Sequence, residues 1–271
     1  MRLHVSALRP IPETYPVNLS PEFVILLVAV LFVSAMVNGV AGFGFATIAV
    51  GVLANFLGPK TGIIVMSLIV PPLISVQLIH HRAFRGVLRR MLTFIAAALV
   101  GSAVGVQLLI LLPGFVLSLA LGLFGLWFLS NAARSEPMQI PPHAERIVAP
   151  GAGLVAGMLN GGLGASGPVV GSYLLAIGLK HREFVFAMSS AFAAMGVLRM
   201  SLLFALGQYT MQLVLLAAAL FVPSVLGQQA GFALQDRISR VAFQRVIVLL
   251  LLVASGALLV RGVLGAIAQV G

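Results

Sequence analysis

Two glycine-rich stretches in an otherwise apolar chain combine the group types that bind small anions. Residues 38–44 read NGVAGFG, and residues 160–167 read NGGLGASG. Where glycines interrupt a helix, backbone N–H groups are free to bind a ligand, and the ligand can approach closely. Amide and hydroxyl side chains nearby supply further donors. The candidate binding residues are Asn38, Gly39, Gly42, Gly44, Thr47, Ser67, Asn160, Gly161, Gly164, Ser166, Gly167, Ser189, Ser190 and Arg199.

A structural interpretation of the same glycines and serines stays open. The spacing Gly153-x3-Gly157-x3-Gly161 is typical of glycines that let two membrane helices pack closely. A single serine in a membrane helix often donates to the carbonyl of the residue four positions earlier. These glycines and serines could therefore serve packing alone.

Arg199 is the one charged residue that lies well inside an apolar run. A charge near the centre of a membrane helix costs at least about 2.5–3.5 kcal/mol on insertion scales, so we expect a role that compensates for it. Two interpretations remain. The guanidinium attracts an anion along an aqueous path, or the side chain snorkels to the outer surface, about 10 Å away by helix rise.

The acidic residues argue against cation transport and against catalysis. All six lie in predicted loops or at predicted helix ends, so no buried carboxylate is available to carry a proton or bind a cation. The apolar runs lack the HExxH, GxSxG and paired-aspartate motifs of hydrolytic enzymes, and the chain has no cysteine. We expect a small anionic substrate, no enzymatic activity, and no metal or cofactor.

The composition places these residues in a membrane. Of 271 residues, 61% are hydrophobic and 8% are charged, whereas soluble domains have about 45–50% apolar and about 25% charged residues. In a soluble protein the net charge of +10 would suggest nucleic-acid binding, but here most basic residues flank apolar runs. The expected partner is therefore the lipid bilayer, not nucleic acid.

Ten continuous apolar segments predict an all-α polytopic membrane protein. Three segments, of 13, 14 and 12 residues, reach only about 18–21 Å of a hydrocarbon core of about 30 Å. We therefore interpret residues 22–57 and 147–179 as re-entrant helical hairpins, broken at glycine-rich tips inside the membrane. The segments are 22–37, 45–57, 61–80, 91–112, 115–130, 147–160, 168–179, 183–206, 212–233 and 243–262.

The two hairpins belong to a sequence repeat. Residues 38–67 align with 160–189 at a constant offset of 122, with eight of thirty positions identical. The identities include the Asn-Gly-x-x-Gly pattern and a Met-Ser pair. Two five-segment halves joined in this way predict an inverted-topology repeat, because an odd number of segments turns the second half over. The helices that follow the tips should begin near Thr47 and Val169 and point their positive dipole ends at the tips.

Basic residues orient the halves. Eleven lie on one side of the predicted membrane and four on the other, with Arg199 between them. The richer side is cytoplasmic by the positive-inside rule, so both termini are expected outside. The predicted organisation is 1–21 N-terminal extramembrane segment, 22–130 first repeat, 131–146 cytoplasmic linker, 147–262 second repeat and 263–271 C-terminal tail.

Each glycine-rich stretch is followed by a short apolar segment and a turn marked by basic residues or proline, Gly58-Pro59-Lys60 and Lys180-His181-Arg182. In these features, and in its repeated organisation over about residues 22–262, the chain resembles the sulfite exporter TauE/SafE family of bacterial membrane permeases. The second stretch matches the glycine-rich pattern of the family better than the first, where Phe45 and Ala46 replace glycine. The resemblance implies outward transport of sulfite or an organosulfonate across the bacterial inner membrane.

The leading hypothesis is a secondary transporter that binds a small sulfur oxyanion between the two tips near the membrane midplane and moves it by alternating access. A permease for another small anion or a carboxylate is one alternative. A membrane assembly subunit that does not transport is another, in which the tips only pack helices. A homodimer is compatible with either reading.

Overall fold

The computed structural model describes residues 21–41, 45–80, 86–132, 139–179, 181–234 and 240–270, and these form ten α-helices and no strand. The predicted all-α class is confirmed. By length and composition, α4, α8 and α9 are apolar enough to cross a membrane. The helices are α1 (Pro21–Ala41), α2 (Phe45–Leu57), α3 (Pro59–His80), α4 (Val87–Leu111), α5 (Gly114–Ala132), α6 (Pro142–Leu163), α7 (Gly167–Ala176), α8 (His181–Ala205), α9 (Met211–Leu234) and α10 (Arg240–Val270).

Two predicted boundaries are wrong. The segment expected at 147–160 is part of α6, which has 22 residues and is therefore about 33 Å long, enough to cross the hydrocarbon core. The hydropathy pattern hid this length because α6 begins in the polar residues around Glu145 and continues past Asn160. Helix α10 is likewise longer than expected, at 31 residues. Short helices do follow both glycine-rich stretches, as predicted, with 13 residues in α2 and 10 in α7.

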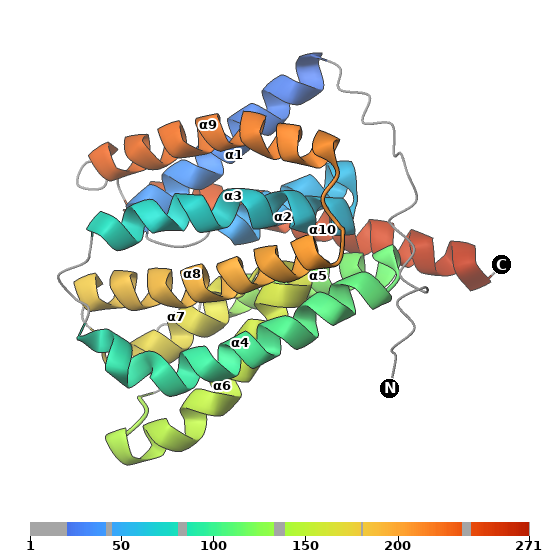
Figure 1. Ribbon diagram of the computed structural model, residues 1–271. Helices are drawn as coiled ribbons and strands as arrows, with labels where there is room; N and C mark the ends of the chain where they lie inside the picture. Colours follow the sequence, from blue (N-terminus) through green and yellow to red (C-terminus); the bar gives the residue numbers. More distant parts are fainter. Residues whose placement is uncertain are drawn as a thin grey trace.

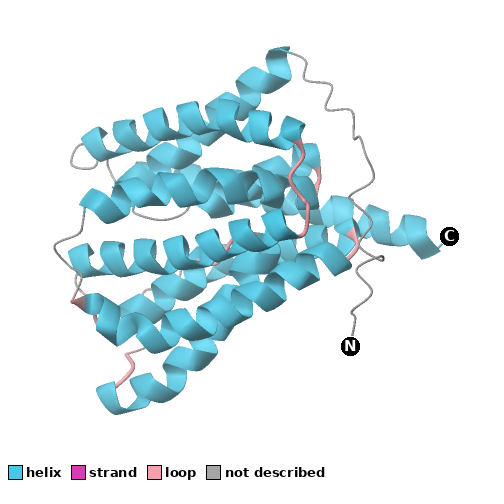
Figure 2. Ribbon diagram, viewed as in Figure 1, coloured by secondary structure: helices cyan, strands magenta, loops and turns pink. Residues whose placement is uncertain are grey.

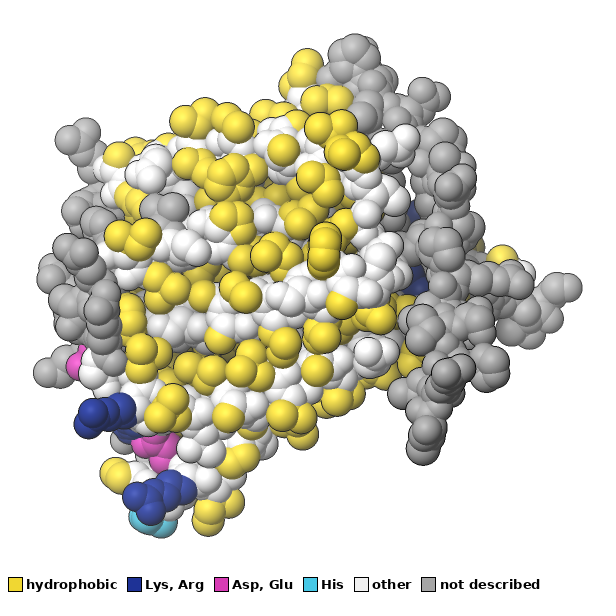
Figure 3. All heavy atoms as spheres, viewed as in Figure 1, with side chains coloured by type: hydrophobic (Ala, Val, Ile, Leu, Met, Phe, Trp, Pro, Cys, Tyr) yellow, Lys and Arg dark blue, Asp and Glu magenta, His cyan; other side chains and the backbone are white. Residues whose placement is uncertain are grey.

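Four long helices lie side by side in the order α9, α3, α8, α4 (Figure 1). Helix α1 packs on α9, α6 packs on α4, and α5 packs on α10. The same view coloured by secondary structure shows how little of the described chain lies outside helices (Figure 2). On this face the described side chains form a broad apolar band, and arginine, acidic and histidine side chains gather at one end (Figure 3). An apolar face with charged side chains gathered at its end is the surface expected of a protein in a bilayer.

The α1/α9 and α4/α6 contacts repeat each other. A Cβ added to Gly105 of α4 would collide with the Met158 carbonyl and lie 3.0 Å from the Gly161 Cα. A Cβ added to Gly231 of α9 would collide with the Met36 carbonyl and lie 2.9 Å from the Gly39 Cα. The contacted residues differ by the offset of 122 that relates the two sequences. This repeated packing agrees with the predicted repeat, and the opposite orientation of its halves stays a prediction.

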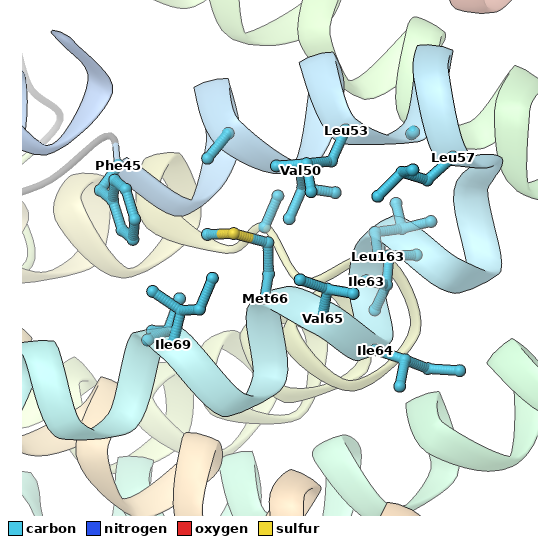
Figure 4. Packing of buried hydrophobic residues seen from close by; sticks show 14 of the residues in the cluster. Phe45, Val50, Leu53, Leu57, Ile63, Ile64, Val65, Met66, Ile69 and Leu163 are labelled. Carbon is cyan, nitrogen blue, oxygen red and sulfur yellow. The ribbon is translucent and has the colours of Figure 1, made fainter. Parts of the chain in front are cut away.

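A buried apolar cluster holds the short helix α2 against α3 (Figure 4). Val50 and Leu53 of α2 and Ile63 and Met66 of α3 are completely buried. Leu163, the last residue of α6, belongs to the same cluster. The cluster therefore fixes α2, which follows the first glycine-rich stretch, against the end of the helix that leads into the second.

Candidate substrate-binding site

The second glycine-rich stretch is mostly helical, and only Gly164, Ala165 and Ser166 separate α6 from α7. Gly164 has the left-handed conformation, with φ +69°, and its N–H donates to the Asn160 carbonyl at 2.9 Å. Glycine adopts this conformation without the steric cost of a Cβ, so the sequence dictates that α6 ends here. Pro168, in the first turn of α7, suits a helix start because its missing N–H would have no helical partner there.

Arg199 of α8 points at this turn. The side chain is only 1% exposed, and Nη1 donates to the Asn160 carbonyl at 2.8 Å. The same carbonyl thus accepts hydrogen bonds from the glycine that ends α6 and from the guanidinium. Arg199 does not snorkel to a polar surface, so that sequence interpretation is wrong.

The guanidinium has no anionic partner among the described residues, in which the one ion pair joins Arg90 and Glu145 at 2.7 Å. Its Nε is buried and without a hydrogen-bond partner in the described chain. A buried cation is stable only when it is paired or hydrogen-bonded, and bidentate binding of an oxyanion is the typical pairing for arginine. The unpaired positive charge of Arg199 can therefore bind a small oxyanion.

The start of α2 packs against the same turn. A Cβ added to Gly164 would lie 3.1 Å from Arg199 Nη1 and 3.2 Å from Val50 Cγ2. A Cβ added to Gly167 would lie 3.7 Å from the Thr47 hydroxyl oxygen. The two glycines therefore let α2 and Arg199 approach the backbone of the second stretch. Sequence positions 47 and 199 meet here through the fold.

The Asn160 amide adds polar groups to this turn. Nδ2 donates to Ser166 Oγ over 3.4 Å, and Oδ1 is buried without a hydrogen-bond partner in the described chain. Asn160, Gly164, Ser166, Gly167, Thr47 and Arg199 thus form one cluster, which we call the α6/α7 site. These six are the predicted residues that the structure brings together.

Other predicted residues have different surroundings. Ser190 donates to the Phe186 carbonyl four positions earlier at 2.8 Å, which is the structural alternative for a serine in a helix. Asn38 and Ser189 are both buried, and each has an interaction partner. Gly42 and Gly44 lie outside the described residues.

The sequence predicted that Gly39 and Gly161 lie in irregular tips, and this prediction is wrong. Helices α1 and α6 both continue through these glycines. A Cβ on Gly161 would collide with the Ser102 carbonyl of α4, and a Cβ on Gly39 with the Gln228 carbonyl of α9. Their observed contacts are therefore with neighbouring helices. The prediction overestimated the irregular part because glycine lowers helix propensity without preventing a helix that packing stabilises.

Sequence reasoning missed Tyr209, in the turn between α8 and α9. Its hydroxyl lies 2.7 Å from Ser67 Oγ on α3. The signal was available, because a tyrosine lies in an uncharged turn ten positions after the arginine of the apolar run. Ser67 therefore contacts this turn instead of standing open.

The family model for the sulfite exporter TauE/SafE matches residues 26–258. The chain belongs to the TauE/SafE family. The match spans both glycine-rich stretches, Arg199 and all ten helices at least in part. No curated protein and no solved structure gives a significant match.

Membership of the TauE/SafE family makes the chain a membrane permease of the sulfite or sulfonate exporter type, not an enzyme. It also implies a small anionic substrate and a lipid environment. These findings confirm the expected class of function. They disfavour a membrane subunit that does not transport.

Proposed function

We propose that the protein exports a small sulfur oxyanion, such as sulfite or an organosulfonate, which binds at the α6/α7 site. The observation that carries the proposal is the buried Arg199 guanidinium, which has no carboxylate partner among the described residues. Its Nε and the remaining donors of the guanidinium suit two oxygens of one anion. The hydroxyls of Ser166 and Thr47 are close enough to the turn to add hydrogen bonds.

The dipole of α7 favours the same ligand. This helix begins at Gly167, and no side chain caps its N-terminus at Ser166. Uncapped N–H groups at a helix start carry a partial positive charge that attracts anions. Together with Arg199, the start of α7 would stabilise one negative charge. Lipid tails and apolar side chains at the same depth give an anion no such stabilisation.

Transport through this site requires helices to move. In the present conformation Arg199 is 1% exposed, so an anion in water does not reach it. We infer that the α1/α9 and α4/α6 units move relative to the central α3 and α8, opening the site to each side of the membrane in turn. The repeated packing of the two units supports this inference, because two similar units offer two similar conformations.

The test is flux in proteoliposomes with sulfite, sulfoacetate, taurine, sulfate and acetate as substrates. Arg199→Ala should lose most sulfite flux, and Arg199→Lys should keep part of it, because lysine retains charge without bidentate binding. Arg261→Ala is the matched control, since Arg261 also donates to a backbone carbonyl, that of Asn55, at 2.6 Å but is exposed.

Expression level and melting temperature are measured beside flux, so that a misfolded variant is not mistaken for a transport defect. Wild-type sulfite flux in a well-folded Arg199→Ala protein would contradict the proposed site. Absence of sulfite and sulfonate flux in the wild-type protein, with acetate transported, would contradict the proposed substrate.

A further inference from the structure

Gln228, on α9, has a buried side chain. Neither helix packing nor the α6/α7 site explains why a polar residue is buried there. Gln228 is 0% exposed, and neither Nε2 nor Oε1 has a hydrogen-bond partner among the described residues. Buried polar groups are nearly always paired, and an unpaired one opposes folding.

Local structure does not explain Gln228. Ser224, one turn earlier on α9 and equally buried, donates to the Leu220 carbonyl at 2.8 Å. Asn55 of α2 donates to Gly51 and Ala254 carbonyls at 2.9 and 3.0 Å. The Ser224 hydroxyl and the Asn55 amide thus both find backbone acceptors in the bundle. Gln228 is in the same apolar surroundings and finds none in the described chain.

The position of Gln228 places it at the first glycine-rich stretch. Its backbone carbonyl would collide with a Cβ on Gly39, so α1 and α9 are in close backbone contact there. The chain then enters α2 at Phe45, and Thr47 of α2 lies against Gly167 of the α6/α7 site. Gln228 therefore lies beside the end of α1, the helix that precedes α2 in the chain.

The repeat gives Gln228 a counterpart. It precedes Gly231 by three residues, as Ser102 precedes Gly105, and these two glycines make the repeated α1/α9 and α4/α6 contacts. Ser102 lies beside Gly161, and its Oγ is also buried without a partner in the described chain. Both Asn-Gly helix ends are thus flanked by an open polar side chain.

We propose that Gln228 contacts the substrate and selects an anion that carries a hydrogen-bond donor in addition to its acceptor oxygens. The inference rests on the proposed transport function and adds the substrate class. Arg199 only donates hydrogen bonds, whereas a carboxamide both donates and accepts. An anion with acceptors alone leaves Oε1 unpaired, whereas a hydroxyl or a protonated oxygen on the anion satisfies it.

The experiment compares two probes that differ in one donor, ethanesulfonate and 2-hydroxyethanesulfonate, as competitors of sulfite flux in proteoliposomes. The wild-type protein should bind the hydroxylated probe about tenfold more tightly, the size of one net hydrogen bond. Gln228→Met, which keeps the length of the side chain, should abolish that preference and change the inhibition constant of ethanesulfonate less than about twofold. Ser224→Ala is the control and should keep the preference.

Melting temperature separates binding from folding. Removing an unpaired amide should leave the melting temperature of Gln228→Met unchanged or raise it. Equal competition by both probes in the wild-type protein, or a preference that survives in Gln228→Met, would overturn this inference. If sulfite flux still depends on Arg199 in that case, the proposed function stands. A lowered melting temperature with equal weakening of both probes would make Gln228 structural and overturn the inference as well.

Discussion

At the end of α6, Gly161 lies against the Ser102 carbonyl of α4, and at the end of α1, Gly39 lies against the Gln228 carbonyl of α9. The two contacts involve backbone on both sides and are geometrically alike. Their polar surroundings differ, because the first lies beside the buried Arg199 and the second beside an uncharged carboxamide. The repeat thus preserves helix packing, which needs only glycine at the contact, and leaves the charge of each half free to differ.

The same difference extends to the helices that carry the charges. The offset of 122 that relates the halves pairs Arg199 of α8 with Gln77 of α3. One half therefore supplies a cation, and the other supplies a neutral amide at the corresponding sequence position. A single buried cation suits a ligand with one negative charge to neutralise.

The largest expected effect concerns the side of the membrane that each loop faces. If the halves are inverted, equivalent loops of the two halves face opposite sides. The chain has no cysteine, so single cysteines can be introduced without removing native ones. In intact cells a membrane-impermeant maleimide should label Thr210→Cys, in the turn between α8 and α9, and should label Arg89→Cys only after permeabilisation. The cysteine-free parent is the control. Labelling of Arg89→Cys from outside would reverse the orientation.

Alanine at the two packing glycines tests whether the interfaces are equivalent. Gly39→Ala and Gly161→Ala each introduce a Cβ into a facing carbonyl, so both should lower the free energy of unfolding by about 1–3 kcal/mol, as overpacked contacts do. Melting temperatures in detergent measure the loss. Gly151→Ala is the matched control, because Gly151 lies in α6 with no atom within 4 Å of the added Cβ. A loss for only one of the two variants would show that the interfaces differ.

Much of this architecture was predictable from the sequence, for identifiable reasons. The starts of α2 and α7 were predicted within a few residues, because glycine and proline mark them chemically. The start of α6 was not, because hydropathy detects burial in lipid, and the first turns of α6 carry Glu145 in an ion pair with Arg90. A helix that leaves the apolar layer keeps its backbone hydrogen bonds while its hydropathy falls.

The candidate site was predictable in part. Arg199 was identified because a charge in an apolar run is costly, but its contact with Asn160 depends on how α8 packs, which the local sequence does not contain. Ser190 was grouped with the site by residue type, although its neighbour is the Phe186 carbonyl of its own helix. Gln228 escaped notice because its significance comes from burial, which is a property of the fold.

Gly164 and Gly178 offer a finer comparison, since both have positive φ, +69° and +74°. Alanine at either position should lower the free energy of unfolding by about 1–2 kcal/mol, because an L-residue is strained there. Only Gly164→Ala also places a Cβ 3.1 Å from Arg199 Nη1, whereas nothing lies within 4 Å of a Cβ on Gly178. The KM for sulfite should therefore rise in Gly164→Ala alone. An equal rise in Gly178→Ala would mean that backbone strain, not displacement of Arg199, weakens transport.

The smallest effect on stability is expected within a pair of serines on neighbouring helices, Ser67 on α3 and Ser190 on α8. Their hydroxyls have different hydrogen-bond partners. Ser67 on α3 pairs with the Tyr209 hydroxyl at 2.7 Å, whereas Ser190 on α8 donates only to its own helix. Ser67 also donates to the Ile64 carbonyl of its own helix. Ser67→Ala should therefore lower the free energy of unfolding by about 1–3 kcal/mol, the net value of two hydrogen bonds, and Ser190→Ala by less. Tyr209→Phe removes only the bond between the two hydroxyls and should cost less than Ser67→Ala, which also removes the hydrogen bond from Ser67 to the Ile64 carbonyl. The double variant should cost no more than Ser67→Ala alone. Additive losses in this cycle would mean that the two hydroxyls act independently, and the link between α3 and the α8–α9 turn would then contribute nothing to stability.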